Sequence, residues 1–268
     1  KYTLMPLKEA IYNMHFPKDE KAMNVARETI IFIEFFIFQV QVQFRRLTHK
    51  KTGAGEPVHY DLEQLKLFFG QLPFELTQAQ KKAVNDISAD LKRPIQMYRL
   101  LQGDVGSGKT VVAAGAVVAV QSAGIQSAVM APTEILAEQH FNSFMKMFSN
   151  STIEIALLTG STKTKERREI LERLALGEID LLVGTHALIQ DDVVFKRLGL
   201  ITIDEQHRFG VKQRKALREK GSQPDVLFMT ATPIPRTLSM TAYGEMDVTV
   251  IDEMPAGRLP IKTYWIKK

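Results

Sequence analysis

The feature that most constrains this chain is the segment 103–110, GDVGSGKT, which fits the pattern G-x-x-x-x-G-K-[ST] at every fixed position. Glycines in such a loop let the backbone wrap around a phosphate with its N–H groups, and the following helix adds the positive end of its dipole. Lys109 would then reach the β- and γ-phosphates, and Thr110 would place its hydroxyl on Mg²⁺. The predicted phosphate-binding residues are Gly103, Asp104, Val105, Gly106, Ser107, Gly108, Lys109 and Thr110.

The pattern carries this meaning only between a strand and a helix, and the surrounding sequence predicts both. From about Leu72 onward, short β-branched runs alternate with stretches rich in alanine and charge, which is typical of a parallel sheet with helical crossovers. The predicted strands are 97–101, 127–130, 155–158, 181–183, 200–203 and 226–229. The predicted helices are 77–91, 109–122, 134–148, 163–175 and 235–243. The fold class is therefore α/β, doubly wound.

A second candidate site follows the predicted strand 200–203, which ends in Asp204 and Glu205. Asp204 at the carboxyl edge of the strand would hold Mg²⁺ through water, and Glu205 would orient or deprotonate the attacking water. The alternative is a solvated loop with ordinary charge. The phosphate-binding loop upstream favours a catalytic pair, because both segments then lie at one edge of the sheet.

The first seventy residues differ from the rest in the pattern of their apolar and polar residues. Residues 38–44 alternate strictly between apolar and polar, which favours a strand, whereas residues 20–27 are rich in helix formers. Because no turn residue interrupts the stretch, we expect one helix from about residue 18 to 47. The polar segment 48–57, which contains Gly53 and Gly55, is predicted to be an exposed loop.

Composition excludes several kinds of site. The chain has no cysteine, so it has no disulfide, zinc–thiolate site or cysteine nucleophile. Its net charge of +5 is compatible with a polyanionic partner without demonstrating one. The longest apolar stretch, 30–42, contains Glu34 and falls short of the about 18 residues that a membrane span needs. Residues 163–173 mix both signs of charge, as solvated helix faces do.

Further motifs give the chain a family resemblance. Asp204-Glu205-Gln206-His207 is a variant of the box that names DEAD/DEAH helicases, and the supporting motifs occur in the order found in that family. They are Phe74 with 76–80 (the adenine-reading Q motif), 131–137 (motif Ia), 159–160 (motif Ib), 184–186, and 230–232 (motif III). The chain therefore resembles the first motor domain of superfamily-two helicases, a RecA-like P-loop domain with a mainly parallel sheet sandwiched by helices. Here a helical connector precedes it.

Within this superfamily the resemblance is strongest to the RecG type, which remodels stalled forks and branched DNA in bacteria. The segments that carry it are 101–110, 204–211 and 229–238. Coupling translocases of the Mfd type resemble the chain around 232–238, but Gln102 and the pair 206–207 favour the RecG type. The resemblance extends over about 72–261. It implies ATP and Mg²⁺ as cofactors, branched DNA as partner, no membrane, and the bacterial cytoplasm as location.

The resemblance also implies roles for individual residues. Phe74 would stack on adenine and Gln80 would hydrogen-bond its edge; the alternative for Phe74 is core packing before a helix cap at Thr77. The residues that would meet the phosphodiester backbone are Thr133, Gly160, Thr185 and His186. The residues that would couple the nucleotide to DNA are His207, Thr230 and Thr232. His186 is otherwise a histidine satisfied at a strand end, and the coupling residues are otherwise a helix cap and buried hydroxyls.

The same resemblance suggests that the chain is a fragment. Residues 1–70 would be a helical connector or the end of a missing N-terminal wedge, 71–256 the ATP-binding domain, and 257–268 the start of a linker to a missing second motor domain. Without the arginine finger of that second domain, ATP hydrolysis should be weak. Two other functions stay open: an RNA helicase of the same superfamily, and a nucleotide-binding scaffold without motor activity.

Overall fold

The computed structural model describes residues 4–52, 55–205, 208–232 and 246–253. Its contacts divide the chain into two compact units, one formed by residues 1–49 and 235–245 and the other by residues 50–234 and 246–268. The predicted helix 235–243 and the predicted linker 257–268 lie outside the described residues.

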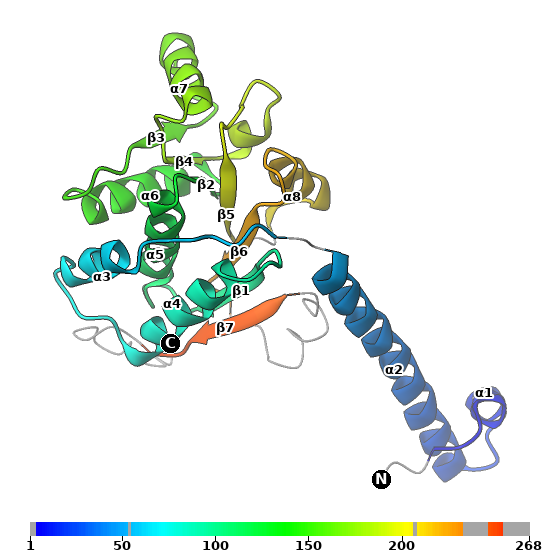
Figure 1. The fold of residues 1–268 in the computed structure, drawn as a ribbon. Helices are drawn as coiled ribbons and strands as arrows, with labels where there is room; N and C mark the ends of the chain where they lie inside the picture. Colours follow the sequence, from blue (N-terminus) through cyan, green and yellow to red (C-terminus); the bar gives the residue numbers. More distant parts are fainter. Residues whose placement is uncertain (1–3, 53–54, 206–207, 233–245, 254–268) are drawn as a thin grey trace, which may run out of the picture. The chain divides into compact units, whose positions relative to one another are not determined.

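Two helices make up the described part of the first unit, α1 (Leu7–His15) and α2 (Glu20–Thr52) (Figure 1). The Asp19 carboxylate accepts the Ala22 N–H at 2.6 Å, which satisfies a free donor at the start of α2. The prediction of one continuous helix is confirmed, because nothing in α2 breaks the backbone ladder. The predicted loop from residue 48 was wrong in its first part, since α2 continues to Thr52. Neither α2 nor any other described helix is long and apolar enough to cross a membrane.

The second unit is built on a seven-stranded sheet in the order β3-β4-β2-β5-β6-β1-β7. All its pairings are parallel. The strands are β1 (Tyr98–Gly103), β2 (Gln126–Met130), β3 (Ile155–Leu158), β4 (Leu181–Gly184), β5 (Leu198–Asp204), β6 (Asp225–Thr230) and β7 (Asp247–Ile251). The α/β prediction and all six predicted strands are confirmed, and β7 is an addition at the edge beside β1.

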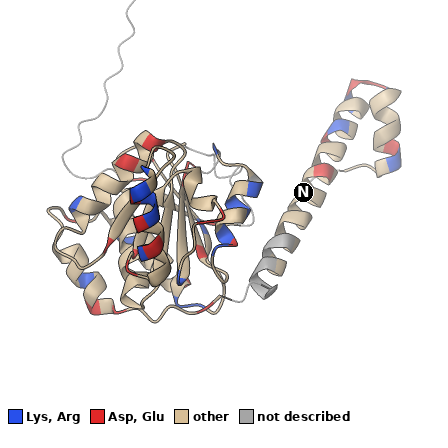
Figure 2. Ribbon diagram, turned by 90° about the horizontal axis from the view of Figure 1, so that it is seen from above, with Lys and Arg blue, Asp and Glu red and all other residues tan. Residues whose placement is uncertain are grey.

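Helices connect these strands. They are α3 (Leu62–Gly70), α4 (Gln78–Leu91), α5 (Lys109–Ser122), α6 (Glu134–Met147), α7 (Thr164–Leu176) and α8 (Val211–Arg218), with a short 3₁₀ helix η1 (His186–Ile189) (Figure 1). Along the helices of this unit, Lys and Arg residues are interspersed with Asp and Glu residues (Figure 2). On α7, for example, Arg168 lies 4.0 Å from Glu172, one turn along the helix. That mixture agrees with the solvated face predicted for residues 163–173.

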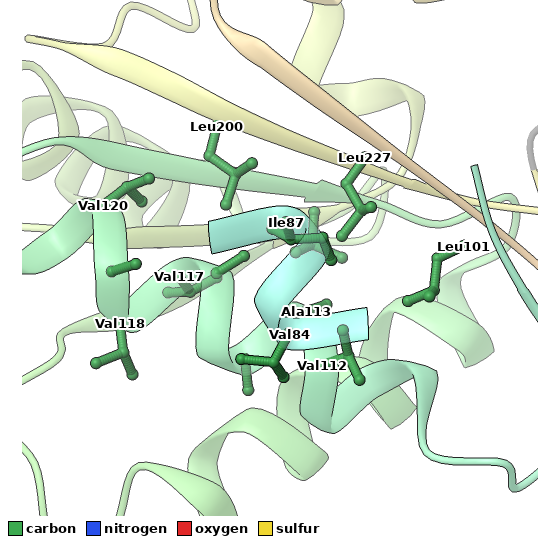
Figure 3. Packing of buried hydrophobic residues seen from close by; sticks show 14 of the residues in the cluster. Val84, Ile87, Leu101, Val112, Ala113, Val117, Val118, Val120, Leu200 and Leu227 are labelled. Atoms are coloured by element: carbon green, nitrogen blue, oxygen red, sulfur yellow. The ribbon is translucent and has the colours of Figure 1, made fainter. Parts of the chain in front are cut away.

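The main core lies between one face of the sheet and α5. Residues 111–120 of α5 are all buried, so this helix occupies the centre of its layer. Figure 3 shows Val117 and Val120 of α5 close to Leu200 of β5, with Ile87 of α4 beside them. Leu65 and Phe68 of α3 belong to the same cluster. Helix α3 therefore packs against α5 and belongs to the same compact unit as the sheet.

On the opposite face of the sheet, α8 covers aromatic residues. The Arg218 guanidinium lies 5.4 Å from the centre of the Tyr98 ring, and that of Arg214 lies 6.0 Å from the centre of the Phe228 ring. Tyr98 and Phe228 themselves meet edge to face, with centroids 5.0 Å apart. The sheet is thus covered by helices on both faces, and its carboxyl edge carries the loops that form the candidate site.

Candidate active site at the carboxyl edge of the sheet

The phosphate-binding loop connects β1 to α5, as the pattern requires. Gly106 has a φ of +78° and Gly108 a φ of +91°, a region that residues with a Cβ rarely adopt. A side chain at Gly108 would also run into the amide of Gln80. The Ser107 N–H donates to the Asp104 carbonyl at 3.1 Å, which closes the turn. The glycines are therefore needed both for the backbone conformation and for the contact with α4.

Lys109 folds back over this loop. Its Nζ donates to the Gly103 carbonyl at 2.6 Å and to the Asp104 carbonyl at 2.9 Å. Burial lowers the pKa of Lys109, and the negative charges of Asp204, Glu205 and Asp104 oppose that shift. The lysine thus lies in the electrostatic field of Asp204 and Glu205, beside the loop at which an anionic ligand would bind.

The acidic pair follows β5, two strands from β1. Asp204 ends the strand with 8% of its surface exposed, and Glu205 has a φ of +47°. The Glu205 N–H donates to Asp204 Oδ1 at 3.0 Å. A left-handed conformation at a residue other than glycine costs about 1–3 kcal/mol. Its effect here is to turn the Glu205 side chain toward the end of β6.

At the end of β6, the Glu205 carboxylate meets the motif 230–232. Its Oε1 accepts the Ala231 N–H at 3.1 Å, and its Oε2 accepts the Thr230 hydroxyl at 3.4 Å. Thr230 and Thr232 share a hydrogen bond of 2.7 Å between their hydroxyls. Thr230 is buried and Thr232 is exposed. His207, the third predicted coupling residue, lies outside the described residues.

The Q-motif residues differ in exposure. Phe74 is 48% exposed, so it is not a core residue, and Thr77 caps α4. Gln80 is only 1% exposed. Its Oε1 accepts the Thr77 N–H at 2.9 Å, and its Nε2 donates to the Ser107 carbonyl at 2.7 Å. Gln80 therefore ties α4 to the phosphate-binding loop, and each end of its amide has the capacity for one further hydrogen bond.

The candidate DNA-contacting residues follow β2, β3 and β4, on the other half of the same edge. Thr133, Gly160 and His186 are exposed, whereas Thr185 is 2% exposed. The Thr185 hydroxyl has no hydrogen-bond partner among the described residues. The structure thus brings three of the four to the surface, while the Thr185 side chain faces the interior.

The residues present fit Mg²⁺. The Thr110 hydroxyl and the Asp204 carboxylate supply the hard oxygen donors that this ion prefers. In the part of the chain that the structure describes, no three His, Asp or Glu residues cluster into a metal cage.

Sequence reasoning missed three residues that hold the site together. Glu253, just after β7, accepts the Ala79 N–H at the start of α4 at 3.1 Å. Glu134, at the start of α6, accepts the N–H of Ser161 at 3.1 Å and its hydroxyl at 2.9 Å. His140 of α6 contacts Asp204 at 2.7 Å. Only for Glu253 was there a local signal, because it follows the β-branched run 248–251.

Comparison with known proteins agrees with this geometry. Residues 77–241 match the family model described as DEAD/DEAH box helicase. Two relatives, each named ATP-dependent DNA helicase RecG, come from Staphylococcus epidermidis (56% identical over 267 residues) and Bacillus subtilis (55% over 266). These matches take in 100% and 99% of this chain, but the chain spans only 39% of either relative.

A solved structure of RecG bound to a three-way DNA junction matches 97% of this chain and 35% of its own, with a TM-score of 0.83 and 44% identity. The RecA-like fold expected from the sequence is thereby confirmed. With the family's phosphate-binding loop, acidic box and motif III meeting at one edge of that fold, the chain belongs to the DEAD/DEAH box helicase family.

Proposed function

We propose that this chain is the ATP-binding first motor domain of a RecG-type helicase, which uses ATP hydrolysis to remodel branched DNA. One observation carries the proposal: the phosphate-binding loop, the acidic pair and Thr230 lie at neighbouring strand ends along one edge of the sheet. The names of the relatives and the DNA junction in the solved RecG structure support DNA as the partner. The bacterial relatives support a cytoplasmic location.

Nucleotide binding would use the loop amides, Lys109 and Phe74. Lys109 would exchange the Gly103 and Asp104 carbonyls for phosphate oxygens, which gives stronger, charge-assisted hydrogen bonds. The exposed Phe74 ring is accessible to an adenine base, and Gln80 would hydrogen-bond the edge of that base. Thr110 and Asp204 would hold Mg²⁺, which screens phosphate charge when bound.

Hydrolysis would depend on Glu205. The Ala231 N–H and the Thr230 hydroxyl hold the Glu205 carboxylate at the end of β6, where it would orient a water molecule and accept its proton. Thr230, Thr232 and His207 would carry changes at Glu205 to the DNA side. The bond between Glu205 and Thr230 supports that coupling.

The DNA strand would cross the other half of the edge. Thr133, Gly160 and His186 are exposed at the ends of β2, β3 and β4, where hydroxyl, backbone and imidazole groups are suited to phosphate contacts. Thr185 would contribute through its backbone, because its side chain is buried. Such contacts position a strand without reading its sequence.

Other parts of the motor would come from outside this chain. Because the chain spans 39% of its relatives, we infer that residues 1–70 connect to an N-terminal wedge, that 71–256 form the ATP-binding domain, and that 257–268 lead to a second motor domain. An arginine finger from that domain is typically worth about 10³–10⁵ in rate. The chain alone should therefore bind ATP and hydrolyse it poorly.

The first test is Mg²⁺-dependent binding of a fluorescent ATP analogue to this chain and to its Lys109→Ala variant. We expect the variant to lose binding while circular dichroism shows the same fold. Equal binding by both proteins would refute the role of Lys109.

A second test addresses the substrate. In the complete helicase, forked DNA should stimulate ATP hydrolysis more than RNA of equal length, and Glu205→Gln should abolish unwinding of a three-way junction. Stronger stimulation by RNA would favour an RNA helicase, and unchanged unwinding would favour a scaffold without motor activity.

A further inference from the structure

His140 is a partly buried histidine that the family motifs quoted above do not include. It lies on α6, and its Nε2 is 2.7 Å from Oδ2 of Asp204, 64 residues away in sequence. Each of the two side chains is only 12% exposed. Since a carboxylate oxygen can only accept, the imidazole donates this hydrogen bond.

The contact fixes a carboxylate that would otherwise turn freely. The terminal torsion of an aspartate is broad, so one hydrogen bond to a main-chain donor leaves its orientation loosely defined. Here Oδ1 accepts the Glu205 N–H and Oδ2 accepts the hydrogen bond from His140. Each carboxylate oxygen thus has its own donor, and the two donors together fix the orientation of the group. Each oxygen keeps a further lone pair for a metal-bound water.

The element that carries His140 is itself firmly held. Phe144, one turn further along α6, is fully buried, and its ring lies 6.3 Å from the imidazole. Phe148 continues this row of rings, with centroids 5.8 Å apart. The imidazole therefore approaches Asp204 from a packed helix, as expected of a group that orients a metal ligand.

We propose that His140 is a positioning residue for Asp204, and that it sets how tightly the site takes Mg²⁺ with a nucleotide. The proposal rests on the proposed function, because it assigns His140 a role only if Asp204 holds the ion. Partners of this kind typically change metal affinity about 10–100-fold. A packing role alone would need the ring and not its N–H group.

The test compares four variants by the Mg²⁺ concentration that gives half-maximal binding of a fluorescent ATP analogue to the 268-residue chain. His140→Phe keeps a ring against Phe144 but removes the donor. His140→Gln places an amide N–H near the position of Nε2, whereas His140→Asn has a shorter amide that falls short of Asp204. Glu138→Gln, an exposed change on the same helix, is the matched control.

We expect His140→Phe and His140→Asn to raise the half-maximal Mg²⁺ concentration about 10–100-fold. His140→Gln should stay near the wild-type value, and the control should not change it. Binding of the analogue in EDTA should be the same for all variants. If His140→Phe lowers the melting temperature, so that its fold is in doubt, the comparison of His140→Gln with His140→Asn still tests the proposal.

Two results would overturn the inference. One is a Mg²⁺ dependence that is unchanged in folded His140→Phe or His140→Asn; the other is an equal loss in the Gln and Asn variants. Either would leave the proposed function standing, provided that Lys109→Ala abolishes binding. If the wild-type chain bound the analogue without any dependence on Mg²⁺, the proposed function would fail first and the inference with it.

Discussion

Asp225, the first residue of β6, should make the stability of this chain fall as the pH rises from 3.8 to about 7. The residue is 7% exposed, and its carboxylate accepts the Met97 N–H at 2.6 Å. Burial raises its pKa to about 7, helped by the charge of Asp90 and opposed by the Met97 N–H. Between these two pKa values, Asp225 is protonated in the folded protein but ionised in the unfolded chain, where its pKa is 3.8.

The size of the effect follows from the difference between the two pKa values. Below pH 3.8 both states are protonated and Asp225 contributes no pH dependence. Between pH 3.8 and about 7 the folded state binds more protons than the unfolded state, so its stability decreases with rising pH. About 3 pH units at roughly 1.4 kcal/mol each give a total loss of about 4 kcal/mol, complete above pH 7.

Asp225→Asn isolates this contribution, because asparagine keeps an acceptor for Met97 and removes the charge. Urea unfolding followed by circular dichroism at pH 5, 6, 7 and 8 should show a stability advantage for the variant that grows to about 4 kcal/mol at pH 8. Asp191→Asn, an exposed carboxylate before β5, should show no such trend. A difference between Asp225→Asn and wild type that stayed constant with pH would refute the reasoning.

Three further predictions concern the site and its support. Glu205→Gln should keep binding of the ATP analogue but slow hydrolysis by the complete helicase about 10²–10⁴-fold, measured as phosphate release, because an amide cannot accept a proton. Gly108→Ala should abolish binding of the ATP analogue and lower the free energy of unfolding by about 1–3 kcal/mol, because Gly108 has a φ of +91° and Gln80 occupies the space that a Cβ would need. Binding is measured by calorimetry and stability by thermal unfolding. Gly70→Ala is the control, because a Cβ there would meet nothing within 4 Å. Arg99→Met should cost about 1.5–3 kcal/mol in urea unfolding, because it removes the guanidinium 2.7 Å from Asp90 Oδ2 and leaves the buried Asp90 carboxylate with Arg93 alone. Arg168→Met removes an exposed ion pair on α7 and should cost far less.

The parts of the fold that sequence could predict are those whose cause is local. Helix α5 begins and ends at the predicted residues, because the glycine loop fixes its start and an apolar run defines its length. Strands buried on both faces stand out as short β-branched runs. Strand β7 was missed although Val248, Thr249, Val250 and Ile251 form such a run. Helix α3 was assigned to the connector, since only contact with α5 shows that it belongs to the sheet-containing unit.

The site shows the same limit. Motifs located the phosphate-binding loop and the acidic pair, because each is a contiguous segment with its own backbone requirement. Gln80 was assigned to adenine from its motif, yet Thr77 and Gln80 also form a capping box, and the capping amide reaches Ser107. The contact between His140 and Asp204 depends on how α6 packs against β3 and β4, which no spacing in the sequence encodes.

Hydrogen bonds around the acidic pair connect the two halves of the sheet edge, the half with the nucleotide-binding candidates and the half with the DNA-contacting candidates. Ser161, beside the candidate DNA contact Gly160, is held by Glu134 at the start of α6. Two turns further on, His140 of the same helix holds Asp204, whose neighbour Glu205 is held by Ala231 and Thr230. Because Glu134 and His140 lie on one packed helix, we expect their two contacts to move together. A displacement of the loop at Gly160 would therefore reach the carboxylates through one rigid element.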